Sequence, residues 1–425
     1  MDTEFHYYIN YIIALRAGFA PEIAYKIAYS AQYVDDNTEN YTILQKVNLD
    51  LYSNIITQSI NPTLSVKDMI SIYPVFHFIP GDDILKSSSL RRDGECRYMT
   101  TTPNNKLARS ALINALNSSN PYWIGIASHG FVDTWAHQNF TGLKDKYNCV
   151  DKHQTNKTLL GKKFLGLSSY VGHADVLHLP DTPNTTWYDY RLKDMKIDNN
   201  KRFLDAAKNI FEMYLKYADK SLLINIPSDP ESAWNELESA IKAIFISDLE
   251  FLQSFLGQYY EIKSKSTHLI MQILGINKSY RIEFYKQLAK KLEDELGITN
   301  SEFDKYDKNK WLNKALYETL DAIQSYDITA NDNDIQYEEK CAFSLSDSAN
   351  QQYYSGFDIG DQIKRKLSSL LGVYKKLHMW RNNHKYNDWY YFQEAAKTHH
   401  AYVIDKVIRI MRKDIKMMQQ SNINL

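Results

Sequence analysis

Apolar residues recur at helical spacing along most of the chain, so the sequence predicts a mainly α-helical protein. One helix is expected over about residues 4–17, and a second begins at Pro21 and runs to Val34, with Asp35 and Asp36 at its exit. After residue 200 the pattern is helical almost throughout, including residues 310–326, and it ends in two long helices between about residues 361 and 419. The fold class that follows is a bundle of helices.

Three stretches depart from this pattern. Residues 41–59 fit a strand and a helix equally well. ISIYPVFHFIPG, residues 70–81, combines β-branched and aromatic residues with two prolines and predicts an extended segment that ends in a turn. The polar stretch ANDNDIQYEEK, residues 330–340, is the best internal linker.

A further helix is predicted after Asn120 and Pro121, which suit an N-cap and a first helical position, with Gly142 as a stop. It contains SHGFVDTWAHQNF and is apolar on nearly every side, so it should be buried. His129, Asp133 and His137 are four residues apart and share one narrow stripe of this helix.

A buried stripe of imidazoles and a carboxylate needs a polar partner. One interpretation is a His-Asp-His hydrogen-bond relay that satisfies itself. The other is a metal centre in which Asp133 gives one oxygen to each of two ions and so acts as the catalytic bridge.

Other histidines and acids strengthen the metal hypothesis. Seven of the twelve histidines fall before residue 180, mostly near carboxylates. The additional candidate ligands are His6 in EFHYY, Asp35 and Asp36 in QYVDDN, His77 in PVFHFIPG, and His173, Asp175, His178 and Asp181 in VGHADVLHLPD.

Composition and charge limit the alternatives. The 425 residues are 44% hydrophobic and 24% charged, which is typical of a globular protein, and the net charge of -1 gives no strong nucleic-acid-binding signal. The three cysteines lie far apart and suggest neither a disulfide framework nor a thiolate zinc site. Without a signal-peptide pattern or a transmembrane segment, we expect a cytoplasmic protein, or one exported by a route without a cleaved signal peptide.

The ordered set EFHYY, AGFAPEIAYKIAYSAQYVDDNT, FHFIPG, SHGFVDTWAHQNF, GHADVLHLPD and WYYFQEAAKTHH resembles an uncharacterised bacterial family defined by a domain of unknown function. The resemblance covers roughly residues 1–185 and 355–425, which we interpret as a metal-binding helical core. Residues 186–354 match less well and are interpreted as a helical insertion or accessory region that offers a surface for a protein partner.

The order of ligand types is also similar to the superfamily of zinc-dependent phospholipases C and single-strand-specific zinc nucleases. This resemblance implies an all-helical bundle and two or more ions of zinc, or of manganese or iron. Carried over motif by motif, the ligands are His6, Asp36 or Asp35, His77, His129, Asp133, His137 and His173.

The sequence departs from the superfamily pattern in its last ligand pair and in a spacing. Four residues after His173, where a carboxylate is expected, stands Leu177, so Asp175, His178 or Asp181 must substitute. The superfamily also places more residues between the bridging Asp and the next His than the four found here. One superfamily zinc site uses an amine freed by processing, and the unprocessed Met1 leaves it open whether such a third site exists here.

The function expected from these residues is metal-dependent hydrolysis of a phosphoester, with a phospholipid or a nucleotide-type substrate. Glu394 and His400 on a late helix are expected to face the substrate, because their spacing does not suit a local metal pair. A hydrolase of the HD type ranks lower, because the sequence has no His-Asp dipeptide. The remaining alternative is a non-catalytic helical effector or scaffold whose metal site is structural.

Overall fold

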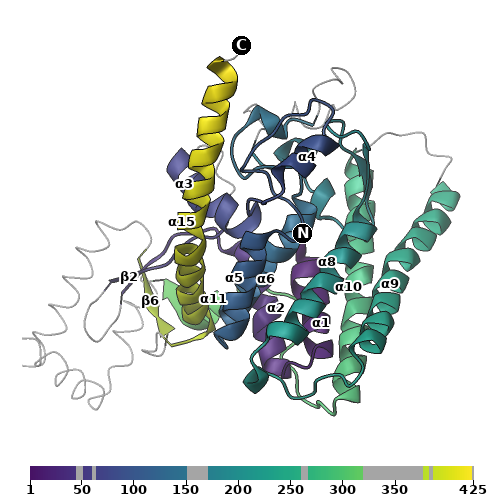
Figure 1. The fold of residues 1–425 in the computed structure, drawn as a ribbon. Coiled ribbons are helices and arrows are strands. Elements are labelled where there is room, and N and C mark those ends of the chain that lie inside the picture. Colours follow the sequence, from purple (N-terminus) through teal and green to yellow (C-terminus); the bar gives the residue numbers. More distant parts are fainter. Residues whose placement is uncertain are drawn as a thin grey trace, which may run out of the picture. The chain divides into compact units, whose positions relative to one another are not determined.

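The structure is a computed structural model that describes residues 1–44, 51–59, 64–150, 171–259, 267–318, 377–381 and 386–423. It is mainly helical, which confirms the expected fold class (Figure 1). The chain forms two compact units, one of residues 1–37, 57–306 and 395–425 and the other of residues 38–56 and 307–394. The division at residues 186–354 stays a prediction, and the expected linker at 330–340 lies outside the described residues.

The first unit is a helical bundle with one small hairpin. Its helices are the π-helix η1 (Glu4–Ile9), α1 (Asn10–Arg16), α2 (Pro21–Asp36), α3 (Val66–Ile72), the π-helix η2 (Tyr73–His77), α4 (Ile84–Leu90), α5 (Lys106–Asn117), α6 (Pro121–Ala136), α8 (Asn199–Tyr217), α9 (Pro230–Tyr259), α10 (Thr267–Glu295) and the part of α15 (Asp388–Ile423) from residue 395 onward. Short 3₁₀ turns cover Lys146–Asn148, Ala174–Val176, Leu179–Asp181 and Lys220–Leu222, and the antiparallel hairpin is β3 (Thr186–Tyr188) with β4 (Lys196–Asp198).

Helix α6 lies at the centre of this bundle, packed against α2, α5, α8 and η2 (Figure 1). It begins as predicted, because the Asn120 side chain accepts hydrogen bonds from the backbone N–H groups of Tyr122 and Trp123, at 3.0 and 3.2 Å. It ends at Ala136, well before Gly142. The backbone turns at Asn139, whose φ is +68°, and His137 is therefore the C-cap residue and not part of the helix.

Two glycines allow α6 to approach its neighbours closely. A Cβ atom at Gly125 would lie 2.3 Å from the carbonyl oxygen of Ile27 on α2. A Cβ atom at Gly130 would lie 3.0 Å from the carbonyl oxygen of Phe76 on η2. The absence of side chains at these positions brings the backbones of α2 and η2 to the stripe that carries His129.

The expectation of an extended segment over residues 70–81 is wrong. Helix α3 continues to Ile72 and is followed directly by η2, whose second residue is Pro74. Val75, Phe76 and His77 are all buried, so burial of these side chains outweighs the local preference of β-branched and aromatic residues for strands.

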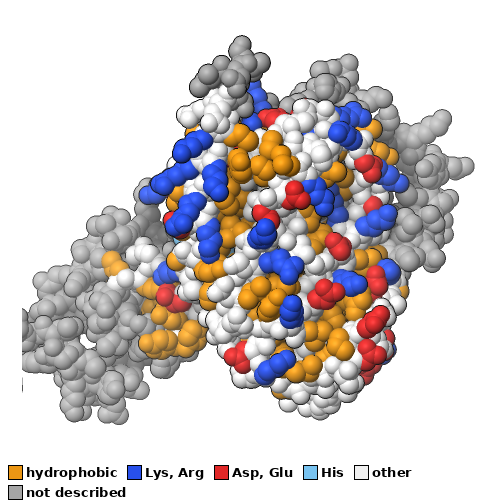
Figure 2. Space-filling model, viewed as in Figure 1, with side chains coloured by type: hydrophobic (Ala, Val, Ile, Leu, Met, Phe, Trp, Pro, Cys, Tyr) orange, Lys and Arg blue, Asp and Glu red, His pale blue; other side chains and the backbone are white. Residues whose placement is uncertain are grey.

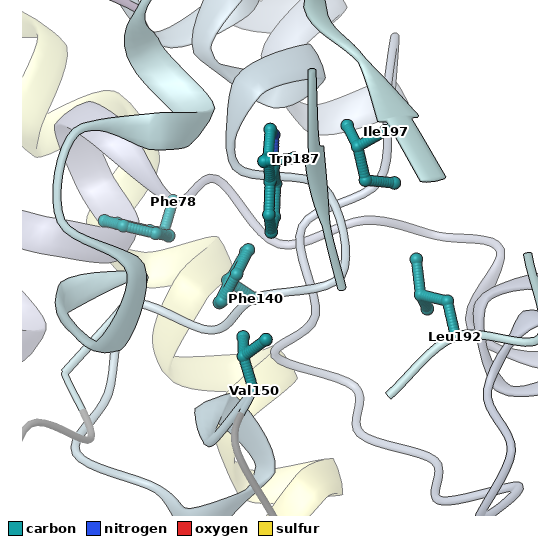
Figure 3. Packing of buried hydrophobic residues seen from close by; sticks show 6 residues of the cluster. All are labelled: Phe78, Phe140, Val150, Trp187, Leu192 and Ile197. Atoms are coloured by element: carbon teal, nitrogen blue, oxygen red, sulfur yellow. The ribbon is translucent and has the colours of Figure 1, made fainter. Parts of the chain in front are cut away.

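An apolar cluster closes the end of the bundle next to the C-cap of α6. It consists of Phe78, Phe140, Val150, Trp187, Leu192 and Ile197 (Figure 3). The ring of Phe78 stacks on that of His137, with 4.2 Å between the centroids. Through Phe78, this cluster therefore covers one face of the His137 imidazole with apolar side chains.

The second unit holds a four-stranded sheet in the order β2-β1-β6-β5. Its strands are β1 (Thr42–Leu44), β2 (Leu51–Ser53), β5 (Leu316–Glu318) and β6 (Leu377–Trp380), and α11 (Lys310–Ala315) precedes β5. The pairing of β1 with β6 is parallel, and the other two pairings are antiparallel. The expectation of helix throughout residues 310–326 and 361–419 is thus wrong at β5 and β6, which pair with each other over a long sequence separation.

The described surface carries charges of both signs. In Figure 2, lysine and arginine side chains are interspersed with acidic ones over the face in view. None of the helices in the described ranges combines the length and apolar composition that a membrane span requires.

Candidate metal centre

Five imidazoles and three carboxylates from separate parts of the first unit converge next to α6. In the described residues they form three groups, and within each group the ligand atoms all lie within 4.8 Å of one another. The groups are His6, His129 and Asp133; Asp35, His77 and His129; and His137, His173 and Asp181. Side chains far apart in the sequence, from residue 6 to residue 181, thus share one buried site.

Asp133 lies where these groups meet. Its Oδ1 atom is 3.2 Å from His6 Nε2. Its Oδ2 atom is 3.1 Å from His129 Nε2, 3.5 Å from His77 Nδ1 and 3.6 Å from His137 Nδ1. The carboxylate is 1% exposed, and its two oxygens face different sets of imidazoles, as a bridging ligand requires.

Backbone carbonyl groups fix the orientation of four of the imidazoles. His129 Nδ1–H donates to Ala31 O at 2.7 Å, and His77 Nε2–H donates to Thr57 O at 2.9 Å. His137 Nδ1–H donates to the carbonyl of His77 at 3.1 Å, and His173 Nδ1–H donates to Leu177 O at 2.7 Å. Each bond leaves the other ring nitrogen with a lone pair directed at the cluster, which is the arrangement of metal-binding histidines.

Two contacts among these rings suit a cation. The inward nitrogens of His77 and His129 lie 2.9 Å apart, and a second proton on one ring or a shared cation would satisfy both. Two nitrogens bound tetrahedrally to one zinc ion at about 2.0–2.1 Å are separated by about 3.3 Å, so the observed spacing is close to that of a shared ion. His6 is fully buried, and neither of its ring nitrogens makes a hydrogen bond within the described part of the chain. The residues therefore fit a metal.

The amino group of Met1 also reaches the cluster. It contacts Asp133 Oδ1 and lies 3.2 Å from Asp181 Oδ1. Burial lowers the pKa of this amine, but Asp133, Asp181 and Asp35 outweigh burial and raise the pKa to about 11. The positive charge of this amine thus faces the carboxylates of Asp133, Asp181 and Asp35.

The carboxylates hold the charged state that binds cations. Burial raises the pKa of Asp133, but His137, the Met1 amine and His129 outweigh it and hold the pKa well below its usual range. Burial also raises the pKa of Asp181, but the charge of His173 and the Met1 amine outweighs burial and holds this pKa well below its usual range. Asp35 differs, since burial keeps its pKa raised.

The imidazoles divide into two kinds. Burial lowers the pKa of His6 well below its ordinary value and lowers that of His137 as well, so both are neutral and able to donate a lone pair. Burial also acts on His129 and His173, but Asp133 outweighs it for His129 and Asp181 for His173, and both pKa values are raised. A metal ion at these two rings competes with a proton.

Three side chains of the cluster are partly exposed. The side chain of Asp35 is 26% exposed, and those of His173 and Asp181 are 15% and 12% exposed, whereas His6, His129 and Asp133 are buried. A surface hollow of about 820 Å³ lies elsewhere, lined by α10 residues such as Lys286 and Lys290 together with Phe303.

The structure decides between the sequence alternatives for two acidic ligands. Asp35 belongs to the cluster, whereas the Asp36 carboxylate accepts hydrogen bonds from Tyr306 OH at 2.9 Å and Gln32 Nε2 at 3.1 Å. Asp181, and neither Asp175 nor His178, groups with His137 and His173. Asp175 Oδ2 instead accepts a hydrogen bond from Val150 N at 3.0 Å.

The two predicted substrate-facing residues lie in different units. Glu394 is in the second unit, where its carboxylate accepts a hydrogen bond from Tyr52 OH at 2.9 Å. His400 is half-buried in the first unit, with its ring 6.4 Å from that of Phe76. Their contact with a substrate stays a prediction.

Sequence patterns did not reveal the groups that orient the ligands. The carbonyls of Ala31, Thr57 and Leu177 are backbone atoms and leave no residue signature. The sequence did show Glu4 as an acid two residues before His6. Glu4 pairs with Arg281 of α10.

The first unit is thus a helical bundle built around a cluster of His and Asp side chains that could hold metal ions. A family model described as a family of unknown function (DUF6765) matches residues 1–407, so the chain belongs to that family. This confirms the expected membership in a family defined by a domain of unknown function, and the match also runs through residues 186–354. Comparison with curated proteins found no match, and comparison with solved structures found none.

Proposed function

We propose that this protein is a metal-dependent hydrolase of phosphoesters in which Asp133 is the shared ligand of two ions. The observation that carries the proposal is the position of Asp133, whose Oδ1 faces His6 at 3.2 Å while its Oδ2 faces His129 at 3.1 Å. A carboxylate that bridges imidazole groups is typical of two-metal sites in which the ions lie about 3.5–4 Å apart.

The donor set favours zinc, with manganese or iron as alternatives, because five imidazoles and three carboxylates combine nitrogen and oxygen ligands without thiolate. A second observation supports zinc ligation. Four of the rings are oriented by carbonyl groups, and such outer hydrogen bonds accompany metal-binding histidines.

Divalent cations in such a site lower the pKa of a bound water towards 7 and neutralise the charge of a phosphate group. The side chains of the protein supply the charges and the oriented lone pairs that hold such cations. Asp133 and Asp181 stay ionised, and the carbonyl-anchored imidazoles keep their lone pairs directed inward without reorganisation. Asp35, His173 and Asp181 are the partly exposed members of the cluster, and we propose that the phosphoester approaches beside them.

Metal analysis of protein purified without chelator tests the proposal. We expect two or more equivalents of zinc, manganese or iron per chain. Hydrolysis of bis(p-nitrophenyl) phosphate, p-nitrophenylphosphorylcholine and single-stranded DNA should then be compared between the wild type and Asp133→Asn. Less than one equivalent of metal, or equal rates in the two proteins, contradicts the two-metal hydrolase.

The second candidate is a non-catalytic helical protein in which the metal only stabilises the fold. It is favoured by the burial of His6, His129 and Asp133, which leaves a narrow exposed edge. Chelation distinguishes the two roles. A large fall in melting temperature on metal removal, with no turnover of any substrate in the panel by the loaded protein, supports the structural role.

A further inference from the structure

His6 differs from the other imidazoles of the cluster. Its ring is fully buried, and neither nitrogen makes a hydrogen bond in the described residues. The ring stacks on that of His129, with 3.9 Å between the centroids, and no backbone carbonyl orients it. Apart from this stacking and the approach of its Nε2 to Asp133 Oδ1 at 3.2 Å, the position of the His6 ring depends on the chain segment that carries it.

Two ion pairs tie that segment to α10, which packs against η1 and α1 (Figure 1). The guanidinium of Arg281 donates two hydrogen bonds to Glu4, from Nε at 2.5 Å and from Nη2 at 2.6 Å. Lys278 Nζ donates to Asp2 Oδ2 at 2.9 Å. Lys278 and Arg281 are three residues apart and therefore share a face of the helix.

Asp2 connects the second ion pair to the backbone of His6. The Asp2 carbonyl oxygen accepts a hydrogen bond from His6 N at 3.0 Å, and Asp2 Oδ1 accepts one from Glu4 N at 3.0 Å. A continuous series of polar contacts thus leads from Lys278 through Asp2 to His6.

The Glu4–Arg281 pair is buried, with exposed fractions of 0% and 4%. The guanidinium contacts both carboxylate oxygens of Glu4, and this bidentate geometry fixes the direction of the carboxylate, which a single ammonium group does not. Arg281 therefore determines the placement of Glu4.

We propose that Arg281 and Lys278 are positioning residues that hold His6 in the metal centre, so that α10 completes one ion site from outside the ligand set. The inference rests on the proposed metal centre. The groups of Asp35 with His77 and of His137 with His173 and Asp181 have no contact with these two cations in the structure described, and they should keep their metal when the contacts are lost.

The test compares zinc binding by the wild type, Arg281→Met, Lys278→Met and Lys290→Met. Lys290 is a matched control, because it lies on the same helix in an exposed ion pair with Asp294. Zinc stoichiometry after dialysis and zinc affinity by competition with a chelating dye are measured, with circular dichroism and melting curves to verify folding.

We expect Arg281→Met to bind about one zinc ion fewer, or to bind one ion about 10–100-fold more weakly, as for other outer contacts of metal ligands. Arg281→Lys should recover part of this loss, and Lys290→Met should equal the wild type. If Arg281→Met does not fold, the same comparison with Lys278→Met decides.

Full stoichiometry and unchanged affinity in a folded Arg281→Met or Lys278→Met protein overturn the positioning role and leave the metal centre intact. A wild type that binds less than one equivalent overturns the metal centre, and the positioning role with it.

Discussion

Asp35 and Asp36 are consecutive residues of α2, but only Asp35 reaches the cluster. Asp35 Oδ1 lies 3.7 Å from His77 Nδ1 and 3.8 Å from His129 Nε2, whereas Asp36 Oδ2 accepts a hydrogen bond from Tyr306 OH at 2.9 Å. Neighbouring positions on an α-helix point about 100° apart, so one of two adjacent acids faces the α6 stripe and the other faces away from it.

This pair gives a prediction with its own control. Asp35→Asn removes a charge from the group of Asp35, His77 and His129. The affinity for the most tightly bound metal ion should fall at least about 10-fold, because an amide is a poorer ligand than a carboxylate. Asp36→Asn should leave metal content unchanged, since its partners are Tyr306 and Gln32. Elemental analysis of both variants is the measurement, and a larger effect in Asp36→Asn would reverse the assignment.

Asp133→Asn should have the largest effect of any single ligand substitution. Changes in outer contacts of metal ligands reduce metal affinity or activity by about 10–100-fold, and loss of a carboxylate that faces imidazoles of all three groups should exceed that range. Isothermal titration with zinc measures the affinity. The side chain keeps its size, so the variant should remain folded, and wild-type affinity in a folded Asp133→Asn protein would show that Asp133 is not a ligand.

Gly125→Ala should destabilise the first unit, because the new methyl group would lie 2.3 Å from the Ile27 carbonyl oxygen on the neighbouring helix. Overpacking of this kind costs about 1–3 kcal/mol. Gly130→Ala should cost less, since its nearest atom is the movable Cδ1 of Ile79. Urea denaturation of the metal-free proteins gives the comparison, and an equal or reversed order would contradict the assigned helix contact.

His399 should make the stability of the first unit depend on pH. Burial lowers the pKa of this imidazole to about 4, and its Nε2–H donates to Val75 O at 3.2 Å. The unfolded chain, with an ordinary pKa of about 6.5, binds the proton more readily than the folded protein. The contribution of His399 is therefore complete above about pH 6.5 and is lost as the pH falls from 6.5 towards 4, by about 3 kcal/mol at most.

His399→Gln removes the titrating group and keeps a donor for Val75. The free energy of unfolding of the metal-free variant should fall less between pH 7 and pH 4.5 than that of the wild type, as measured by urea denaturation at each pH. His400→Gln is the comparison, because burial also lowers the pKa of the half-buried His400 but to a smaller extent, so this variant should change the pH profile less than His399→Gln does. Parallel profiles for His399→Gln and the wild type would exclude the predicted role.

The parts of the site that the sequence predicted are those with a local signature. Asn120 and Pro121 define the start of α6, and helical spacing places His129 and Asp133 on one stripe. Their burial follows from the apolar residues around them, and the structure agrees. Local spacing is enough to predict a helix and its buried face when the cap residues, the period of apolar residues and the expected burial all indicate the same element.

The parts that the sequence did not predict depend on contacts between distant segments. The helical form of residues 73–77 is set by packing of Val75 and Phe76 in the bundle, against their preference for strands. The strands at 316–318 and 377–380 exist because they pair with each other. The choice of Asp181 over Asp175 requires the position of His137, which no local pattern contains.

The order of the ligands along the chain has a consequence for synthesis. The described imidazoles and carboxylates of the cluster have all been translated once Asp181 is added, but the cations that pair with Asp2 and Glu4 come only with Lys278 and Arg281. A nascent chain can thus gather these side chains early, while the segment that carries His6 waits for a helix made much later. Under the proposed positioning role, this segment is the last part of the site to be secured during synthesis.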